Sequence, residues 1–95
     1  MLMFVEFDVS ADIIDVPETV VNNEEHLKTD FLKWLCNHKH MYRKNVNGHT
    51  GLCYRSEAFV DWLNMTVLEQ SEEKASVVQQ YVSIKNDKKL PSILL

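Results

Sequence analysis

Two segments with the same aromatic spacing constrain the fold of this chain more than any other feature. In residues 31–35 (FLKWL) and 59–63 (FVDWL), a Phe is followed by Trp three residues later and by Leu four residues later. These intervals place the three side chains on one face of a helix. Each segment therefore predicts an amphipathic helix, and two broad aromatic faces require a common core. The five-residue match is too short to indicate a structural repeat.

Polar residues indicate where these two helices begin. Asn22 and Asn23 stand before two glutamates, so an Asn oxygen is expected to cap a helix with favourable negative charge in its first turn. This helix should end near Asn37. Ser56 is expected to cap the second helix, whose apolar side should continue to Val67.

A third helix is predicted from Ser71, its expected cap, to about Ile84. Two glutamates follow Ser71 and would lie in the first turn, where negative charge is favourable. The apolar stripe of this helix would consist of Ala75, Val78 and Val82.

Both ends of the chain have the features of strands. Residues 5–9 (VEFDV) alternate apolar and acidic side chains, which predicts one buried face and one wet face. A bent continuation, or a second short strand, covers residues 13–16 and stops before Pro17. Residues 90–95 predict a terminal strand, and Pro91 confines it to a sheet edge or a strand start. The acids assigned to the wet side of the N-terminal segment are Glu6, Asp8, Asp12, Asp15 and Glu18.

Between the two predicted helices, Asn47-Gly48 is the pair most favoured in a two-residue hairpin turn, because both positions need positive φ. The alternative is an ordered loop, since neither face of the hairpin would be uniformly apolar. The expected opposing pairs are Val46 with His49, Arg43 with Leu52, and Met41 with Tyr54.

These elements predict an α+β fold in one small domain, residues 1–95. A small sheet that includes the N- and C-terminal strands should pack against two or three amphipathic helices, with the hairpin around Asn47-Gly48 projecting from them. A chain of 95 residues has enough apolar content, 45%, for one hydrophobic core.

Composition indicates a reduced, cytoplasmic protein. Two cysteines are too few for a disulfide framework, and no secretory signal or membrane-spanning run is apparent. Lys outnumbers Arg eight to two, and seven Asn accompany three Ala and two Gly. That bias is expected of an AT-rich genome, such as that of a low-GC bacterium or its phage.

Charge is segregated along the chain. Residues 1–30 carry a net −7, residues 31–55 carry +5 with no acid, and residues 56–95 carry −2. The basic middle segment faces either an acidic partner or the acidic N-terminal third of its own fold. We favour the internal pairing, because ordinary folds mix both signs of charge on their surfaces.

The same segment holds both cysteines and three of the four histidines. Zinc binds Cys and His, but structural sites bring paired ligands at regular short spacing, which this segment lacks. We therefore interpret the set as a packed Cys36 and surface histidines, predict no metal or other cofactor, and keep a zinc-supported module as an alternative. The candidate ligands are Cys36, His38, His40, His49 and Cys53.

The sequence predicts a non-enzymatic, protein-interaction or regulatory module that binds a protein partner or a second copy of itself. We expect no association with a membrane. Phosphate-binding and dinucleotide-binding motifs are absent from the sequence, and no nucleophile has a recognisable oxyanion hole. The alternative is a nucleic-acid-binding module that uses residues 36–55, where cations and stackable rings alternate, although the overall charge of −4 opposes phosphate. The candidate interaction residues are Lys39, Tyr42, Arg43, Lys44, His49, Tyr54 and Arg55.

Overall fold

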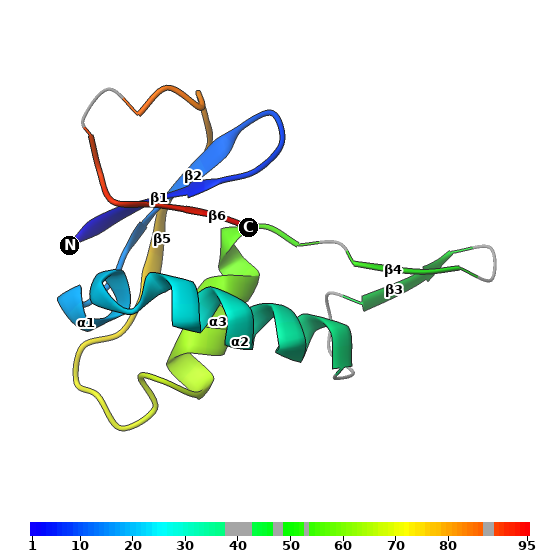
Figure 1. Cartoon of the computed structure of the whole chain (residues 1–95), viewed down its shortest axis with the longest axis horizontal. Helices are drawn as coiled ribbons and strands as arrows, with labels where there is room; N and C mark the ends of the chain where they lie inside the picture. The colour runs from blue at the N-terminus through cyan, green and yellow to red at the C-terminus, as the bar shows by residue number, and fades with distance from the viewer. Residues whose placement is uncertain (38–42, 47–48, 53, 87–88) are drawn as a thin grey trace.

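The computed structural model describes residues 1–37, 43–46, 49–52, 54–86 and 89–95, with residues 37, 43–46 and 49–52 described by their backbone alone (Figure 1). Six strands and three helices lie in these ranges. In chain order they are β1 (Leu2–Glu6), β2 (Ala11–Asp15), α1 (Glu18–Asn22), α2 (Glu24–Asn37), β3 (Arg43–Val46), β4 (His49–Leu52), α3 (Ser56–Met65), β5 (Ser76–Val82) and β6 (Ser92–Leu94).

Four strands form one mixed sheet in the order β5-β2-β1-β6. The central strand β1 pairs antiparallel with β2 and parallel with β6, so strands from both ends of the chain lie side by side. The predicted α+β class, with N- and C-terminal strands in the sheet, is confirmed. β6 begins directly after Pro91 at the end of the sheet, as the proline predicted.

The first strand is shifted relative to its prediction. β1 ends at Glu6, and the N–H of Phe7 donates to the carbonyl of Ser10 at 2.9 Å to close the turn into β2. Val9 lies in this turn and is 88% exposed, so it does not belong to the buried face. The buried residues of β1 are Met3, Phe4 and Val5, so the predicted alternation of one buried and one wet face is wrong for this strand. Pairing with β2 sets where the strand lies, and local alternation does not.

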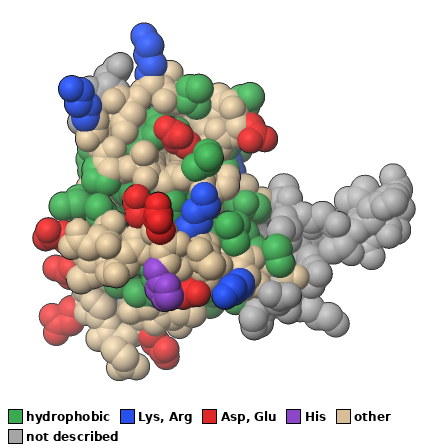
Figure 2. Space-filling model, in the orientation of Figure 1, with side chains coloured by type: hydrophobic (Ala, Val, Ile, Leu, Met, Phe, Trp, Pro, Cys, Tyr) green, Lys and Arg blue, Asp and Glu red, His purple; other side chains and the backbone are tan. Residues whose placement is uncertain are grey.

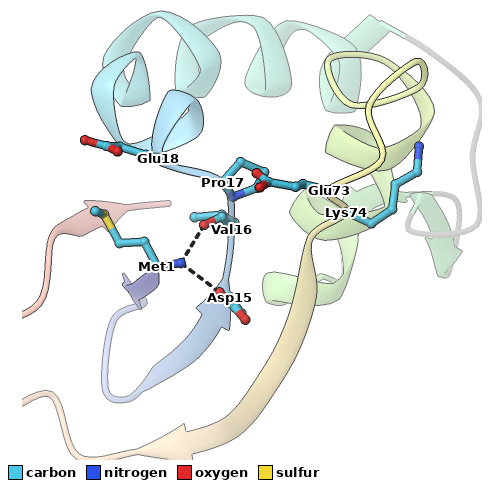
Figure 3. Close-up of a pocket in the computed structure, with 7 residues that line it drawn as sticks. All are labelled: Met1, Asp15, Val16, Pro17, Glu18, Glu73 and Lys74. Atoms are coloured by element: carbon cyan, nitrogen blue, oxygen red, sulfur yellow. Dashed lines mark hydrogen bonds and ion pairs between the residues drawn. The ribbon is translucent and has the colours of Figure 1, made fainter.

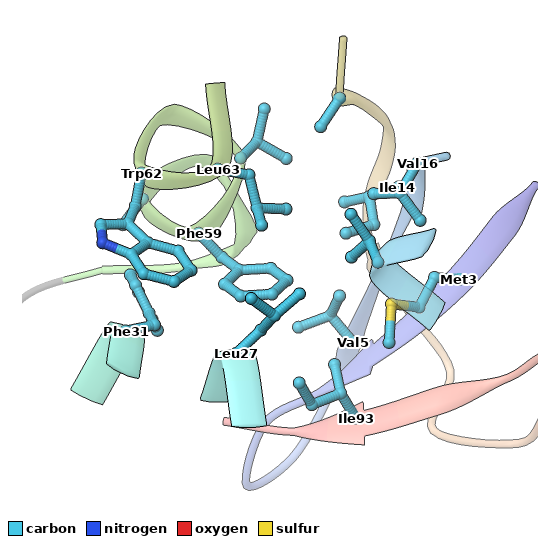
Figure 4. Close-up of a cluster of buried hydrophobic side chains, with 14 of the residues drawn as sticks. Met3, Val5, Ile14, Val16, Leu27, Phe31, Phe59, Trp62, Leu63 and Ile93 are labelled. Carbon is cyan, nitrogen blue, oxygen red and sulfur yellow. The ribbon is translucent and has the colours of Figure 1, made fainter. Parts of the chain in front are cut away.

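The aromatic faces of α2 and α3 fill the core, as their spacing predicted (Figure 4). Phe31 of α2 meets Phe59 and Trp62 of α3 with ring centroids 5.2 and 5.7 Å apart. Aromatic pairs at these separations contribute about 0.5–1.5 kcal/mol beyond their burial. The sheet supplies the opposite wall of the core through Met3, Val5, Ile14, Val16 and Ile93.

The two predicted helices exist, but their predicted caps do not form. The side-chain amide of Asn23 donates to the carbonyl of Thr19 in the preceding short helix α1, which the sequence did not predict. Ser56 is the first residue of α3, and its hydroxyl donates to Asp12 of the sheet. α3 ends at Met65, so Val67 lies beyond it and is 46% exposed.

The predicted third helix is wrong, since residues 76–82 form strand β5. Val77, Val78, Tyr81 and Val82 are β-branched or aromatic, and such residues favour a strand when a partner is at hand. β2 is that partner, and pairing with it outweighs a weak helical stripe. The hydroxyl of Ser71 accepts from the N–H of Glu73 in a local turn in place of a helix cap.

The predicted hairpin register is confirmed where it can be compared. Arg43 pairs with Leu52 and Val46 pairs with His49, as expected from a turn at Asn47-Gly48. The turn itself and Met41 lie outside the described residues. None of the described helices has the length and continuous apolar character that a bilayer crossing requires.

Candidate interaction site

β3 and β4 form a two-stranded ribbon at one end of the molecule, away from the sheet (Figure 1). The two strands pair with each other, and no other described element packs on them to more than a marginal extent. An isolated two-stranded ribbon is marginally stable in water, because it lacks a third strand or a helix to cover one face. The β3–β4 ribbon would therefore gain stability by contact with another surface.

The ribbon returns to the core through Tyr54. The ring of Tyr54 is half-buried and makes edge-to-face contacts with Phe7 and Phe31, at centroid distances of 6.3 and 6.0 Å. Burial raises the pKa of Tyr54, and the nearby Cys36 and Asp8 add to that effect. Tyr54 therefore fastens the ribbon to both the sheet side and the α2 side of the core.

The next residue, Arg55, forms an ion pair with Asp12 of β2. Nη2 of Arg55 lies 2.6 Å from Oδ1 of Asp12, and its Nε lies 3.2 and 3.3 Å from the two carboxylate oxygens. Asp12 is fully buried, and the Arg55 side chain is 18% exposed. This pair joins the basic middle segment to the acidic N-terminal third, which is the kind of internal pairing that the charge pattern predicted.

Asp12 accepts three further hydrogen bonds from the chain around it. The N–H and the hydroxyl of Ser56 donate to Oδ2 at 3.2 and 2.5 Å, and the N–H of Tyr81 donates to Oδ1 at 3.0 Å. One carboxylate thereby connects β2, the start of α3 and β5. Within the described part of the chain, every buried side-chain polar atom has a hydrogen-bond partner.

These contacts determine the charge states of the pair. Burial by itself would raise the pKa of Asp12, but the donors from Arg55, Ser56 and Tyr81 outweigh burial and lower it. The hydrogen bond to Asp12 raises the pKa of Arg55. Asp12 is therefore an anion and Arg55 a cation at neutral pH, and neither charge is left without a partner.

Arg55 is also held between two aromatic rings. Its guanidinium carbon lies 4.5 Å from the ring centroid of Phe7 and 4.0 Å from that of Tyr81. Such cation–π contacts are strongest where water is excluded. Phe7 covers the guanidinium from the turn between β1 and β2, while Tyr81 covers it from β5.

Tyr81 reaches this position through an irregularity in β5. Ala11 pairs with Val82 and Ile13 with Gln79, so Gln80 and Tyr81 together stand opposite Asp12. The extra residue is a β-bulge, a feature that changes the direction of a side chain. Tyr81 has φ of 58°, in the left-handed region that non-glycine residues seldom adopt.

The predicted interaction residues fall into three groups. Tyr54 and Arg55 anchor the base of the ribbon. The strands of the ribbon contain Arg43, Lys44 and His49, whose side chains are not described. Lys39 and Tyr42 lie outside the described residues. Sequence reasoning missed Asp12, which was assigned to the wet side of a strand, and Tyr81, which was assigned to a helix. The structure corrects both, because Asp12 is fully buried and Tyr81 lies in β5.

The candidate zinc ligands are only partly described. Cys36 is exposed at the end of α2, so the interpretation of a packed thiol is wrong. His38, His40 and Cys53 lie outside the described residues, and His49 is described by its backbone alone. Elsewhere in the described ranges, His, Cys, Asp and Glu side chains do not form a group that could hold a metal ion.

Among the described residues, two surface hollows can be outlined. One, of about 530 Å³, lies between the N-terminus, the end of β2 and the chain leading into β5 (Figure 3). In it the amino group of Met1 donates to Asp15 Oδ1 and to the carbonyl of Val16, each at 2.9 Å. The other, of about 200 Å³, lies between Phe4 and Ile13 of the sheet and the residues that follow β5.

Comparison of the chain with protein-family models, curated proteins and solved structures finds no match.

Proposed function

We propose that the protein is a cytoplasmic, non-enzymatic interaction module that uses the β3–β4 ribbon to bind an acidic surface of a partner protein. The observation that carries this proposal is the combination of a ribbon on which other described elements pack only marginally with a base that Tyr54 and Arg55 anchor to the core. A partner that covers one face of the ribbon would supply the packing surface that an isolated two-stranded ribbon lacks.

Charge supports an acidic partner. Residues 38–54 contain Lys39, Arg43 and Lys44 and no acid, whereas the chain as a whole has a net charge of −4. Arg55 is neutralised by Asp12, so its cation is not available to a partner. On the face of the molecule shown in Figure 2, Asp and Glu side chains are spread over the described part of the surface. Complementary charge would direct the partner to the ribbon and away from these acidic parts.

The other surfaces that could join two copies have weaker support. β6 is three residues long, and β5 contains bulges, two features that protect sheet edges from pairing with other chains. The aromatic faces of α2 and α3 are occupied within the core. For these reasons we propose the ribbon, and not a sheet edge or an aromatic helix face, as the interaction surface.

Nucleic-acid binding is the second candidate, because a two-stranded ribbon has the width that the major groove of DNA admits. Three cations form a small footprint for phosphate contacts, which favours the protein partner. Salt dependence distinguishes the two, since phosphate binding weakens steeply with added salt.

The experiment uses fluorescence anisotropy with two labelled probes, a Glu-rich peptide and a short DNA duplex. We expect the peptide to bind, and Arg43→Glu with Lys44→Glu to abolish its binding. Lys85→Glu with Lys89→Glu is the matched control, because it changes the net charge by the same amount as the ribbon variant, at two positions that follow β5. Equal peptide binding by the ribbon variant and the control would exclude the proposed surface. Tight binding of the duplex with a steep salt dependence would favour the nucleic-acid alternative.

A further inference from the structure

Tyr81 combines backbone strain with high exposure. Its φ of 58° is unfavourable for a non-glycine residue, yet the residue is 70% exposed and buries little surface in return. A strained residue that buries little of its own surface gains little core stability in return. The strain therefore calls for an explanation other than core packing.

Two contacts and a β-bulge hold Tyr81 in one orientation. Its N–H donates to the buried carboxylate of Asp12 at 3.0 Å, and its ring lies 4.0 Å from the guanidinium carbon of Arg55. The bulge turns the side chain at this point in β5. One ring face is covered by Arg55, while most of the side chain is open to solvent.

The position of Tyr81 relates it to the ribbon. Arg55, on which the ring stacks, is three residues beyond Leu52, the end of β4. Three residues of chain span at most about 10 Å, and the Arg55 side chain covers the remaining distance to the Tyr81 ring. A partner segment that continues from the ribbon past Arg55 would therefore reach Tyr81.

We infer that Tyr81 is a pre-organised contact for an apolar or aromatic side chain of the same acidic partner segment that the ribbon binds. This inference rests on the proposed function and extends it to the chemistry of the partner. Tyrosine is enriched among residues that dominate binding energy, and a ring that is already held loses little conformational entropy on binding.

The stacking on Arg55 leaves the other face and the edges of the Tyr81 ring to a partner. An apolar group or a second ring gains there from edge-to-face or stacked contact. The partner segment should accordingly combine acids, which face the ribbon cations, with an aromatic residue, which faces Tyr81.

The test compares two labelled Glu-rich peptides that differ at the centre, one with Phe-Pro and the other with Ser-Gly. We expect the Phe-Pro peptide to bind more tightly. Tyr81→Asn should weaken that peptide about tenfold and leave the Ser-Gly peptide unchanged, because Asn tolerates positive φ and lacks the ring. Val78→Ala, another truncation at an exposed position of β5, should alter neither affinity.

Equal affinity of the wild type for the two peptides would overturn the role of Tyr81, and so would an equal effect of Tyr81→Asn on both. The ribbon proposal fails separately, if Arg43→Glu with Lys44→Glu leaves both affinities intact. Urea unfolding of Tyr81→Asn accompanies the binding measurements. A loss of affinity that matches a loss of folded protein would mean that Tyr81 serves only as a cover for the ion pair.

Discussion

Arg55 reaches across the base of the ribbon to place its Nη2 2.6 Å from Oδ1 of the fully buried Asp12. The pair connects β2 to the chain between β4 and α3, while Asp12 also receives N–H groups from Ser56 and Tyr81. A buried ion pair contributes little net stability against an apolar alternative, but the loss of one partner leaves a buried charge without compensation. Its contribution here is to hold the base of the ribbon in one arrangement.

Asp12→Asn should lower the free energy of unfolding by about 3 kcal/mol, because Arg55 then lacks its counter-charge in a mostly buried position. The measurement is urea denaturation followed by Trp fluorescence at neutral pH. Asp8→Asn is the matched control, an exposed acid in the neighbouring turn, and should change stability by no more than about 0.5 kcal/mol. Equal effects of the two variants would mean that the Asp12 contacts do not stabilise the fold.

The pKa of Asp12 predicts how this contribution depends on pH. The folded pKa is lowered from the ordinary value of 3.8, so folding favours the ionised carboxylate. The stability that results is complete above the unfolded pKa and is lost as the pH falls through the folded pKa. We expect the difference in unfolding free energy between wild type and Asp12→Asn to be constant above about pH 5 and to shrink below about pH 4. Urea denaturation from pH 2.5 to 7 measures it, and a constant difference over that range would contradict the assignment.

Local patterns were enough to predict some elements and not others. The spacing of Phe31, Trp34 and Leu35 needs only one helix turn to be recognised, and Asn47-Gly48 determines the hairpin register within a few residues. β5 was mistaken for a helix because its valines fit a helical stripe as well as a strand, and only its pairing with β2 decides between them.

The candidate site could not be predicted in the same way. Asp12 lies 43 residues from Arg55 and 69 from the N–H of Tyr81, so no local pattern distinguishes it from the acids that face solvent. A buried acid is recognisable only from its partners, because burying an unpaired carboxylate costs more free energy than the rest of the fold gains. Arg55 was predicted as an interaction residue from the charge of its segment, whereas the structure shows it paired within its own chain.

Phe31→Ala should destabilise the protein by about 3–5 kcal/mol, because it opens a cavity where the rings of α2 and α3 meet. Phe31 is fully buried, whereas Met65 at the end of α3 is 55% exposed. Met65→Ala is therefore the control and should lie within about 0.5 kcal/mol of wild type. Thermal and urea denaturation measure both variants, and a small effect of Phe31→Ala would mean that the aromatic contacts are not central to the core.

Substitutions at Tyr81 separate backbone strain from the contribution of its ring. Tyr81→Asn and Tyr81→Val both remove the ring from Arg55, but Asn adopts positive φ readily and a β-branched residue does not. We expect Tyr81→Val to be less stable than Tyr81→Asn by about 1–2 kcal/mol in urea denaturation. Val78, in the same strand, is the control position. Wild-type protein should be at least as stable there as Val78→Asn, because a β-branched residue carries no penalty in an ordinary strand conformation. Equal stability of the two Tyr81 variants would mean that β5 relaxes at the bulge, and that the φ of 58° is not imposed by the hydrogen bond from Tyr81 to Asp12.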